Sequence, residues 1–156
     1  MALLEVRDLR TAFPSKDGMT PVVDGVSFDL ERGKVLALVG ESGSGKSMTA
    51  LSTLRLVPKP GRVTSGSVKL DGEELLSLPV TEMRRIRGGR IGMIFQEPMT
   101  SLSQLHTIGD QIGEALHLHR DVSKPEGLRL VVEILRLVGF PNPTGALRMY
   151  PFELSG

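Results

Sequence analysis

An eight-residue stretch in the N-terminal half restricts this chain more than any other feature. Residues 40–47 read GESGSGKS and fill every fixed position of G-x-x-x-x-G-K-[ST], a pattern in which a glycine-rich loop binds phosphate groups. The apolar run Val35 to Val39 before it predicts a strand buried on both faces of a parallel sheet. The stretch from Met48 to Leu56 after it predicts a helix that ends before two prolines. Its apolar face comprises Met48, Leu51 and Leu54.

The residue types of this loop explain the chemistry that we expect from it. Gly43 and Gly45 carry no Cβ, so the backbone can turn sharply and bring N–H groups close to an anion at the start of a helix. Lys46 supplies a mobile charge for the β and γ phosphates, and the Ser47 hydroxyl can complete the coordination of Mg²⁺. A plain Gly/Ser turn is the alternative, but it does not account for all four fixed positions. The predicted nucleotide-binding residues are Gly40, Ser42, Gly43, Ser44, Gly45, Lys46, Ser47 and Met48.

Composition limits the class of protein and its surroundings. The 156 residues suit one domain, and 40% of them are hydrophobic, which is enough for a core. A net charge of +1 gives no large field for nucleic acid or anionic lipid. There is no cysteine, which favours a reducing compartment such as the cytoplasm. Charged residues near the N-terminus argue against a secretory signal, and no apolar run is long enough to span a bilayer.

Alternating apolar and polar residues predict antiparallel strands in the N-terminal part. The pattern covers residues 4–9 and 26–30, and residues 14–21 between them have the composition of an exposed loop. Phe13 lies at the edge of this loop. Its ring could stack on a nucleotide base, although a lone Phe at a strand end is more often a core residue.

The middle of the chain predicts a hairpin, a short helix and another buried strand. Residues 66–70 and 73–76 flank the turn Asp71-Gly72, Thr81 to Arg87 is helical, and Ile91 to Phe95 is apolar throughout. A basic cluster surrounds the end of this helix, at Arg84, Arg85, Arg87 and Arg90. It lacks interleaved aromatic residues, so we interpret it as a solvated face and expect no nucleic-acid partner.

The last third of the chain predicts helices. Thr107 can cap one helix, and Ser123 with Glu126 forms a predicted capping box for a second helix that ends at Gly139. The second helix has an apolar face that comprises Leu128, Val131, Val132, Leu135 and Val138. The histidines do not share the one-turn spacing of metal ligands, so surface positions are favoured over a metal site at His106, His117 and His119.

Three sequence segments resemble one protein family. FQEPMTSL at 95–102, GES at 40–42 and HTIGDQI at 106–112 are similar to an ABC-transporter nucleotide-binding domain, in the oligopeptide and dipeptide importer subfamily. The resemblance implies an α/β fold: a P-loop NTPase (RecA-like) core, an N-terminal antiparallel β subdomain and the start of the ABC α-helical subdomain. It divides this N-terminal part of the domain into residues 1–96, the β subdomain and core, and residues 97–156, the Q-loop and helical subdomain.

The same resemblance implies roles for individual residues. Gln96 corresponds to the Q-loop glutamine, which reaches Mg²⁺ and the attacking water and communicates with the membrane subunit. Leu-Ser-Gly at 154–156 resembles the start of the LSGGQ signature, so Ser155 and Gly156 would bind the nucleotide of a second subunit. Phe13 becomes a base-stacking residue. The implied catalytic residues are Lys46 and Gln96, with Ser47 and Gln96 at the metal.

The resemblance also implies a function. The chain would bind ATP and Mg²⁺ within the ATP-hydrolysing subunit of an importer for peptides or a similar small solute. Its partners would be a second nucleotide-binding subunit and permease subunits at the Q-loop, on the inner face of the cell membrane. The second Walker motif, with its Asp and catalytic Glu, the D-loop and the switch histidine are expected beyond Gly156, so residues 1–156 alone are expected to be inactive as an ATPase.

Two other readings remain beside this function. One is a truncated nucleotide-binding or regulatory fragment without transport ATPase activity. The other is a phosphate-loop kinase or GTPase, which fits the loop but not the Gln96 segment or the terminal Leu-Ser-Gly. The sequence also has no Asn-Lys-x-Asp guanine-binding motif. The chain departs from the usual family pattern at Ser103-Gln104, in place of Asn-Pro, and at Phe152, in place of His.

Overall fold

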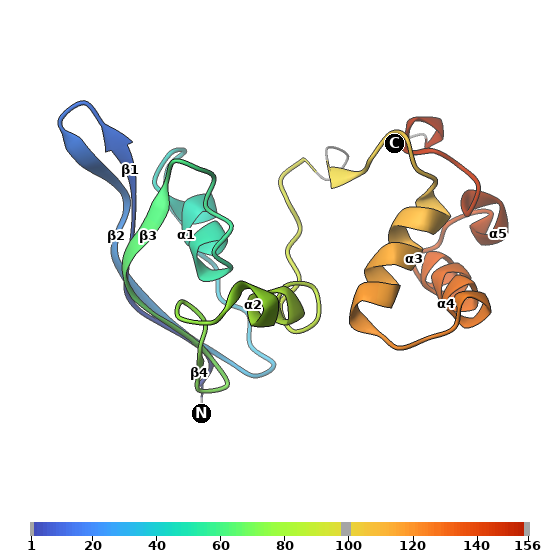
Figure 1. The fold of residues 1–156 in the computed structure, drawn as a ribbon, viewed down its shortest axis with the longest axis horizontal. Coiled ribbons are helices and arrows are strands. Elements are labelled where there is room, and N and C mark those ends of the chain that lie inside the picture. Colours follow the sequence, from blue (N-terminus) through green and yellow to red (C-terminus); the bar gives the residue numbers. More distant parts are fainter. Residues whose placement is uncertain (1, 98–100, 155–156) are drawn as a thin grey trace. The chain divides into compact units, whose positions relative to one another are not determined.

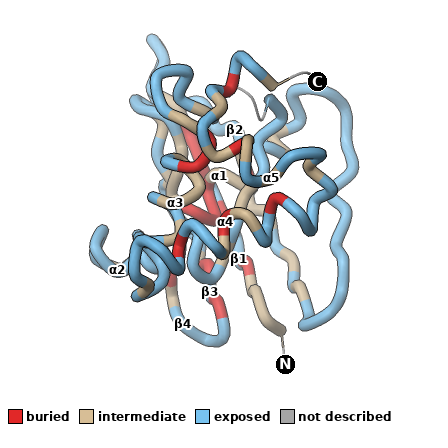
Figure 2. The backbone as a smooth tube through the Cα atoms, turned by 90° about the vertical axis from the view of Figure 1, so that its right-hand side faces the viewer, coloured by how far each residue is buried: buried red, intermediate tan, exposed pale blue. Residues whose placement is uncertain are grey.

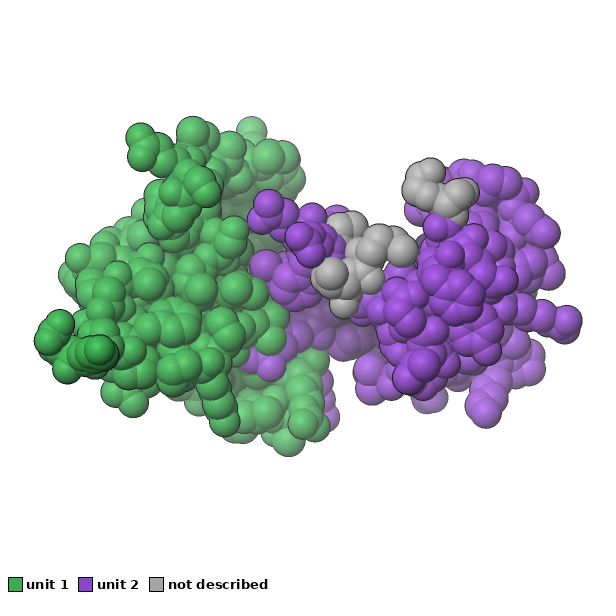
Figure 3. Space-filling view, turned by 90° about the horizontal axis from the view of Figure 1, so that it is seen from above, with its two compact units in different colours: residues 1–84 green, residues 85–156 purple. Residues whose placement is uncertain are grey.

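The computed structural model describes residues 2–97 and 101–154. These residues form two compact units, which divide between Arg84 and Arg85 and are coloured separately in Figure 3. Helix α2 (Val80–Ile86) crosses this division. The domain boundary predicted after residue 96 stays a prediction. In the described part of the chain, no helix is both long and apolar enough to cross a lipid bilayer.

A long hairpin opens the first unit. Strand β1 (Ala2–Ser15) pairs with β2 (Gly18–Glu31) in antiparallel register, as the alternating pattern predicts (Figure 1). The predicted loop at residues 14–21 is wrong, because Pro14 pairs with Met19 and only a two-residue turn separates the strands. β2 forms an edge of the sheet. Pro21 is compatible with that place, since an edge strand tolerates a residue without a backbone N–H.

The hairpin predicted around Asp71-Gly72 is confirmed. Strand β3 (Arg62–Leu70) turns into β4 (Glu73–Glu74), and both turn residues have positive φ, 50° at Asp71 and 81° at Gly72. Two central residues with positive φ characterise the tight turns that match the twist of a hairpin. The sheet order is β2-β1-β3-β4.

Helix α1 (Lys46–Thr53) follows the phosphate loop and contacts β1, β2 and β3. It ends at Thr53, before the predicted end at Leu56, and its buried face is mainly polar: Thr49, Ser52 and Thr53. Each of these hydroxyls has a hydrogen-bond partner, and the Ser52 hydroxyl lies 2.7 Å from that of Thr11 on β1. Of the predicted apolar positions, Leu54 is buried just after the helix, whereas Met48 and Leu51 are only partly buried. Hydrogen bonding compensates the burial of the three hydroxyls.

Two predicted strands are absent from the described residues. Residues 35–39 form no strand, and Val35 is 97% exposed and Val39 92% exposed. Ile91 makes a single bridge to Arg87, and Ile94 is 91% exposed. A buried strand needs a neighbour that accepts its hydrogen bonds and covers its faces. An apolar run shows only that burial of the segment would be favourable. The described sheet provides no neighbouring strand for either segment. Figure 2 shows the buried residues in red.

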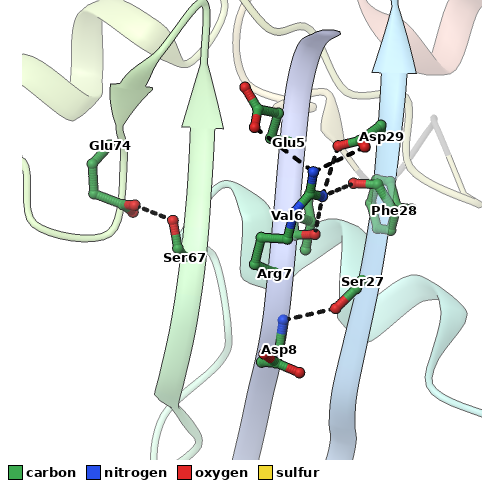
Figure 4. Close-up of polar contacts among 9 residues, drawn as sticks. All are labelled: Glu5, Val6, Arg7, Asp8, Ser27, Phe28, Asp29, Ser67 and Glu74. Carbon is green, nitrogen blue, oxygen red and sulfur yellow. Dashed lines mark hydrogen bonds and ion pairs between the residues drawn. The ribbon is translucent and has the colours of Figure 1, made fainter.

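A charged pair links β1 to β2 on the exposed face of the hairpin (Figure 4). The Arg7 guanidinium lies 2.6 Å from the Asp29 carboxylate and also donates to the Phe28 carbonyl. The hydrogen bond from Arg7 holds the pKa of Asp29 below its ordinary value. Both side chains are exposed, so solvent screens this pair and it adds little to stability.

Glu74 joins β4 to β3 through its carboxylate (Figure 4). The carboxylate accepts hydrogen bonds from the Ser67 hydroxyl and from the N–H groups of Val68, at 3.1 Å, and Leu76, at 3.0 Å. Burial raises the pKa of Glu74, but these hydrogen bonds and the charge of Lys69 outweigh burial and lower it from the ordinary value of 4.5. The ionised form is therefore the one that the fold stabilises.

We expect the first unit to lose stability in acid through Glu74. Because the folded pKa lies below the unfolded one, the contribution is complete above pH 4.5 and disappears as the pH falls through the folded pKa. Glu74→Gln should lower the free energy of unfolding by about 1–2 kcal/mol at pH 7 and by less at pH 3. Urea denaturation at both pH values measures this, with the exposed Glu31→Gln as control. An equal loss at the two pH values would contradict the assignment.

The second unit is helical. Helices α3 (Ile108–His119) and α4 (Lys124–Leu137) pack together, with short α5 (Pro143–Ala146) beside α4. Thr107 caps α3 as predicted, since its hydroxyl accepts the Asp110 N–H at 3.2 Å. The core of this unit comprises Val131, Leu135 and Ala146, with partly buried Ile112, Phe140, Leu147 and Met149 around them. The start of α3 is fixed to residues 147–149 by two backbone hydrogen bonds.

The predicted capping box at Ser123 is wrong. Ser123 occupies the N-cap of α4, but among the described residues its side chain makes no capping bond. Pro125 in the first turn removes one of the N–H groups that the hydroxyl could accept from. A box of this kind forms instead at the 3₁₀ helix Pro151–Glu153, where the Glu153 carboxylate accepts the Tyr150 N–H at 2.8 Å. The predicted end of α4 at Gly139 is confirmed by a positive φ of 77°.

Candidate phosphate-binding site

The loop at residues 40–47 leads directly into helix α1. The Ser44 N–H donates to the Glu41 carbonyl at 3.2 Å, which closes the first turn of the loop. Gly45, with φ 88°, is the N-cap of α1, and no side chain in the described part of the chain caps this end. The N–H groups of the first helical turn and the positive end of the helix dipole are therefore suited to an anion.

Gly45 could not be replaced without moving the backbone. An added Cβ would lie 2.4 Å from the Val22 carbonyl oxygen of β2, and the positive φ is itself unfavourable for any other residue. Strand β2 thus supports the loop from behind. Val22 also lines the loop's cavity, a role that sequence reasoning missed because only strand register brings Val22 to the loop.

Lys46 turns back over the loop. Its ammonium donates to the carbonyl oxygens of Gly40, at 2.7 Å, and Glu41, at 2.6 Å, and to the Ser44 hydroxyl at 3.1 Å. The cation is therefore at the centre of the loop. A compact charge with three donors on a flexible stem can exchange these oxygens for phosphate oxygens.

A cavity of 280 Å³ lies against the loop and gathers most of the predicted residues. Its lining consists of Val22 and the run Gly43–Met48. Ser47 is exposed there, and a contact of its hydroxyl with Mg²⁺ stays a prediction. Gly40 and Ser42 are part of the loop but do not line the cavity. The structure thus brings Gly43, Ser44, Gly45, Lys46, Ser47 and Met48 together.

Phe13 lies outside this cavity lining, on β1 opposite Thr20. Its ring is partly buried and abuts Gly61: a Cβ added to Gly61 would lie 2.4 to 2.8 Å from three ring carbons. This contact fixes the position of the ring in the first unit. Stacking of a base on Phe13 stays a prediction.

Of the remaining predicted residues, Gln96 belongs to the second unit. It is exposed and follows residues 92–95, which form no regular secondary structure. Ser155 and Gly156 lie outside the described residues. Ser103 and Gln104, which depart from the family pattern, lie in a loop that the Gln111 side chain holds in place. This side chain accepts the Ser103 N–H at 2.8 Å and donates to two carbonyls of the loop. Sequence reasoning missed this role of Gln111.

Comparison with known proteins shows the family of this chain. The family model described as ABC transporter matches residues 23–156. The chain belongs to the ABC transporter family. An α/β cassette with a phosphate loop, as the resemblance implies, is thus confirmed as its fold class.

The matched relatives include ATP-binding proteins. A probable peptide ABC transporter ATP-binding protein of Sinorhizobium fredii is 50% identical over 99% of this chain and 46% of its own length. The oligopeptide transport ATP-binding protein AppD of Bacillus subtilis is 46% identical over 99% of this chain and 47% of its own. The chain thus spans about half the length of these two relatives.

A solved structure shows the same fold. The dimeric post-hydrolysis structure of the ATP-binding cassette MJ0796, bound to ADP and Pi, superposes with a TM-score of 0.82. It is 21% identical and covers 97% of this chain and 63% of that one.

Proposed function

We propose that this chain is the nucleotide-binding part of an ATP-hydrolysing subunit that powers the import of peptides or a similar small solute. The observation that carries the proposal is Lys46, which lies among the loop carbonyls at the uncapped start of α1. Two matched relatives are named for peptide and oligopeptide transport and for ATP binding, which supports the same cargo class here.

The described loop fits the phosphates of a nucleotide, because the uncapped start of α1 offers backbone N–H groups and the Lys46 ammonium lies at the same loop. In the proposed site, the N–H groups of the α1 start hold the phosphates and Lys46 neutralises their charge. Ser47 and Gln96 would hold Mg²⁺, which supplies neutralisation of the charge that develops on the transferred phosphoryl group. Phe13 would stack on the base, and Gly40, Ser42, Ser44 and Met48 shape or line the loop.

The partners form part of the proposal. A second nucleotide-binding subunit would receive Ser155 and Gly156 at its nucleotide, and the dimer in the matched cassette structure supports such pairing. Permease subunits would meet the segment around Gln96. These contacts would place the protein on the inner face of the cell membrane.

The alternative, a nucleotide-binding regulatory fragment without transport ATPase activity, is not favoured, because the matched relatives are named as ATP-binding proteins of transporters. A phosphate-release assay in reconstituted membranes, on a protein with the length of these relatives, tests the proposal. ATP turnover is expected, and nucleotide binding without turnover would contradict the proposal.

We expect Gln96→Ala to reduce turnover and leave nucleotide binding nearly unchanged. A side chain that reaches the metal and the attacking water stabilises the transition state more than the bound substrate. In a protein with the length of the matched relatives, kcat should fall by about 10²-fold, while the Kd for Mg-ATP should change by less than about twofold. Steady-state phosphate release and equilibrium titration measure the two, with Gln104→Ala as the control. Weaker ATP binding with an unchanged kcat would contradict the proposed role.

A further inference from the structure

The first unit contains a larger cavity that shares no lining residue with the phosphate-loop cavity. It has a volume of 490 Å³. The run Gly61–Gly66 forms one side, and Arg55, Val57 and Lys59 line it from the segment after α1. Five of these consecutive residues, Arg62–Gly66, belong to β3, so this strand forms part of the cavity wall.

This wall is an unpaired sheet edge. β3 pairs with β1 on one side along the strand, whereas β4 pairs on the other side only at Lys69 and Leu70 (Figure 1). In the described sheet, the stretch Arg62–Gly66 therefore has no neighbouring strand on the β4 side. Backbone N–H and C=O groups along such an edge can accept an additional strand.

The positive charge of the cavity lining favours a strand that carries acidic side chains. Three cations line it, at Arg55, Lys59 and Arg62, and its lining contains no carboxylate. Arg55 is held in place, because its guanidinium donates to the carbonyls of Leu78, at 2.5 Å, and Leu75, at 3.3 Å. Lys59 and Arg62 are exposed, so they can meet an arriving ligand. Complementary charge favours an acidic partner and speeds its association.

We propose that the free edge of β3 binds an extended acidic segment of a partner protein. The backbone of the segment pairs with Arg62–Gly66, and its carboxylates contact Lys59 and Arg62. Five residues of an extended chain rise about 16 Å, so a segment of this length can pair along the five residues of this stretch of β3. A second copy of this chain does not suit the site, because pairing two identical edges would bring both sets of cations together.

The test uses the 156-residue chain and a fluorescent octapeptide of alternating Glu and Val. Fluorescence anisotropy should show saturable binding that weakens with salt. The peptide of alternating Lys and Val should bind at least about tenfold more weakly, and so should the acidic peptide in the double variant Lys59→Glu, Arg62→Glu. N-methylation of alternate backbone nitrogens on the pairing edge should reduce affinity to a similar degree, because it removes ladder hydrogen bonds.

Two matched variants control for folding and for the nucleotide site. Lys16→Glu reverses an exposed charge elsewhere in the first unit, and Lys46→Ala changes the phosphate loop; both should bind the peptide as the wild type does. If the N-methylated peptide bound as tightly as the unmethylated acidic peptide, the site would recognise only the negative charge, and the proposed strand pairing would be wrong. Absence of binding, or a dimer of the chain in sedimentation that the double variant abolishes, would overturn the proposal and leave these cations as edge protection or a self-contact.

Discussion

Replacing Lys46 by alanine is expected to weaken Mg-ATP binding by at least about 30-fold, the equivalent of 2 kcal/mol for a charged hydrogen-bonding partner. The ammonium of Lys46 lies within 3.1 Å of three oxygens of the loop, at the place where the proposed phosphates enter. Its removal leaves the negative charge of the polyphosphate without the cation that the loop positions. Backbone N–H groups remain, so the loss should be large but not complete.

Equilibrium titration with a fluorescent ATP analogue measures this loss. Lys16→Ala is the matched control, since it removes the same charge from an exposed turn of the same unit. Lys46→Met serves as a second variant that keeps most of the aliphatic stem. Circular dichroism must show the same fold for all proteins. Equal affinities for wild type and Lys46→Ala would refute the assignment of residues 40–47 as the nucleotide site.

The largest loss of stability is expected from Gly66→Ala on β3. Gly66 has a φ of 110°, and an added Cβ would lie 2.6 to 2.8 Å from three backbone atoms of β1: the Leu9 Cα and the carbonyl oxygens of Arg7 and Asp8. These atoms belong to a register shift of the β1–β3 ladder, so the backbone of two strands would have to move. Strain and overpacking together should cost about 2–5 kcal/mol in the free energy of unfolding.

Gly72→Ala provides the matched control for this prediction. Gly72 also has positive φ, 81°, but no atom lies within 4 Å of an added Cβ. Its loss should be limited to about 1–2 kcal/mol of backbone strain. Urea denaturation of both variants isolates the contribution of the close contact with β1. Similar midpoints for the two variants would show that β1 can yield at the register shift.

Local signals in the sequence predicted several elements well. The phosphate loop, the turn at Asp71-Gly72 and the cap at Thr107 depend on neighbouring residues, and all three are present. Patterns that depend on distant partners were less reliable. Residues 35–39 have the composition of a buried strand, yet a strand exists only where another strand accepts its hydrogen bonds.

The site residues show the same limit of prediction from local sequence. The cavity residues from Gly43 to Met48 are consecutive, so one motif predicts them all. Val22 is far from them in sequence and reaches the loop through the β1–β2 register and the contact between β2 and α1. The polar contact face of α1 likewise depends on Thr11, which offers a hydroxyl opposite Ser52. Neither feature has a periodic signal of its own.

The three loop oxygens that hold the Lys46 ammonium compete with the proposed phosphates for this cation. A phosphate can take this cation only by replacing the Gly40 and Glu41 carbonyls and the Ser44 hydroxyl. These are neutral acceptors, so their bonds to the ammonium lack the attraction between opposite charges that a phosphate oxygen adds. A neutral nucleoside has no charge to offer in this exchange, whereas each further phosphate adds charge that favours it. The internal bonds of Lys46 are therefore a fixed cost for any ligand that takes this cation, and the charge of a polyphosphate offsets it.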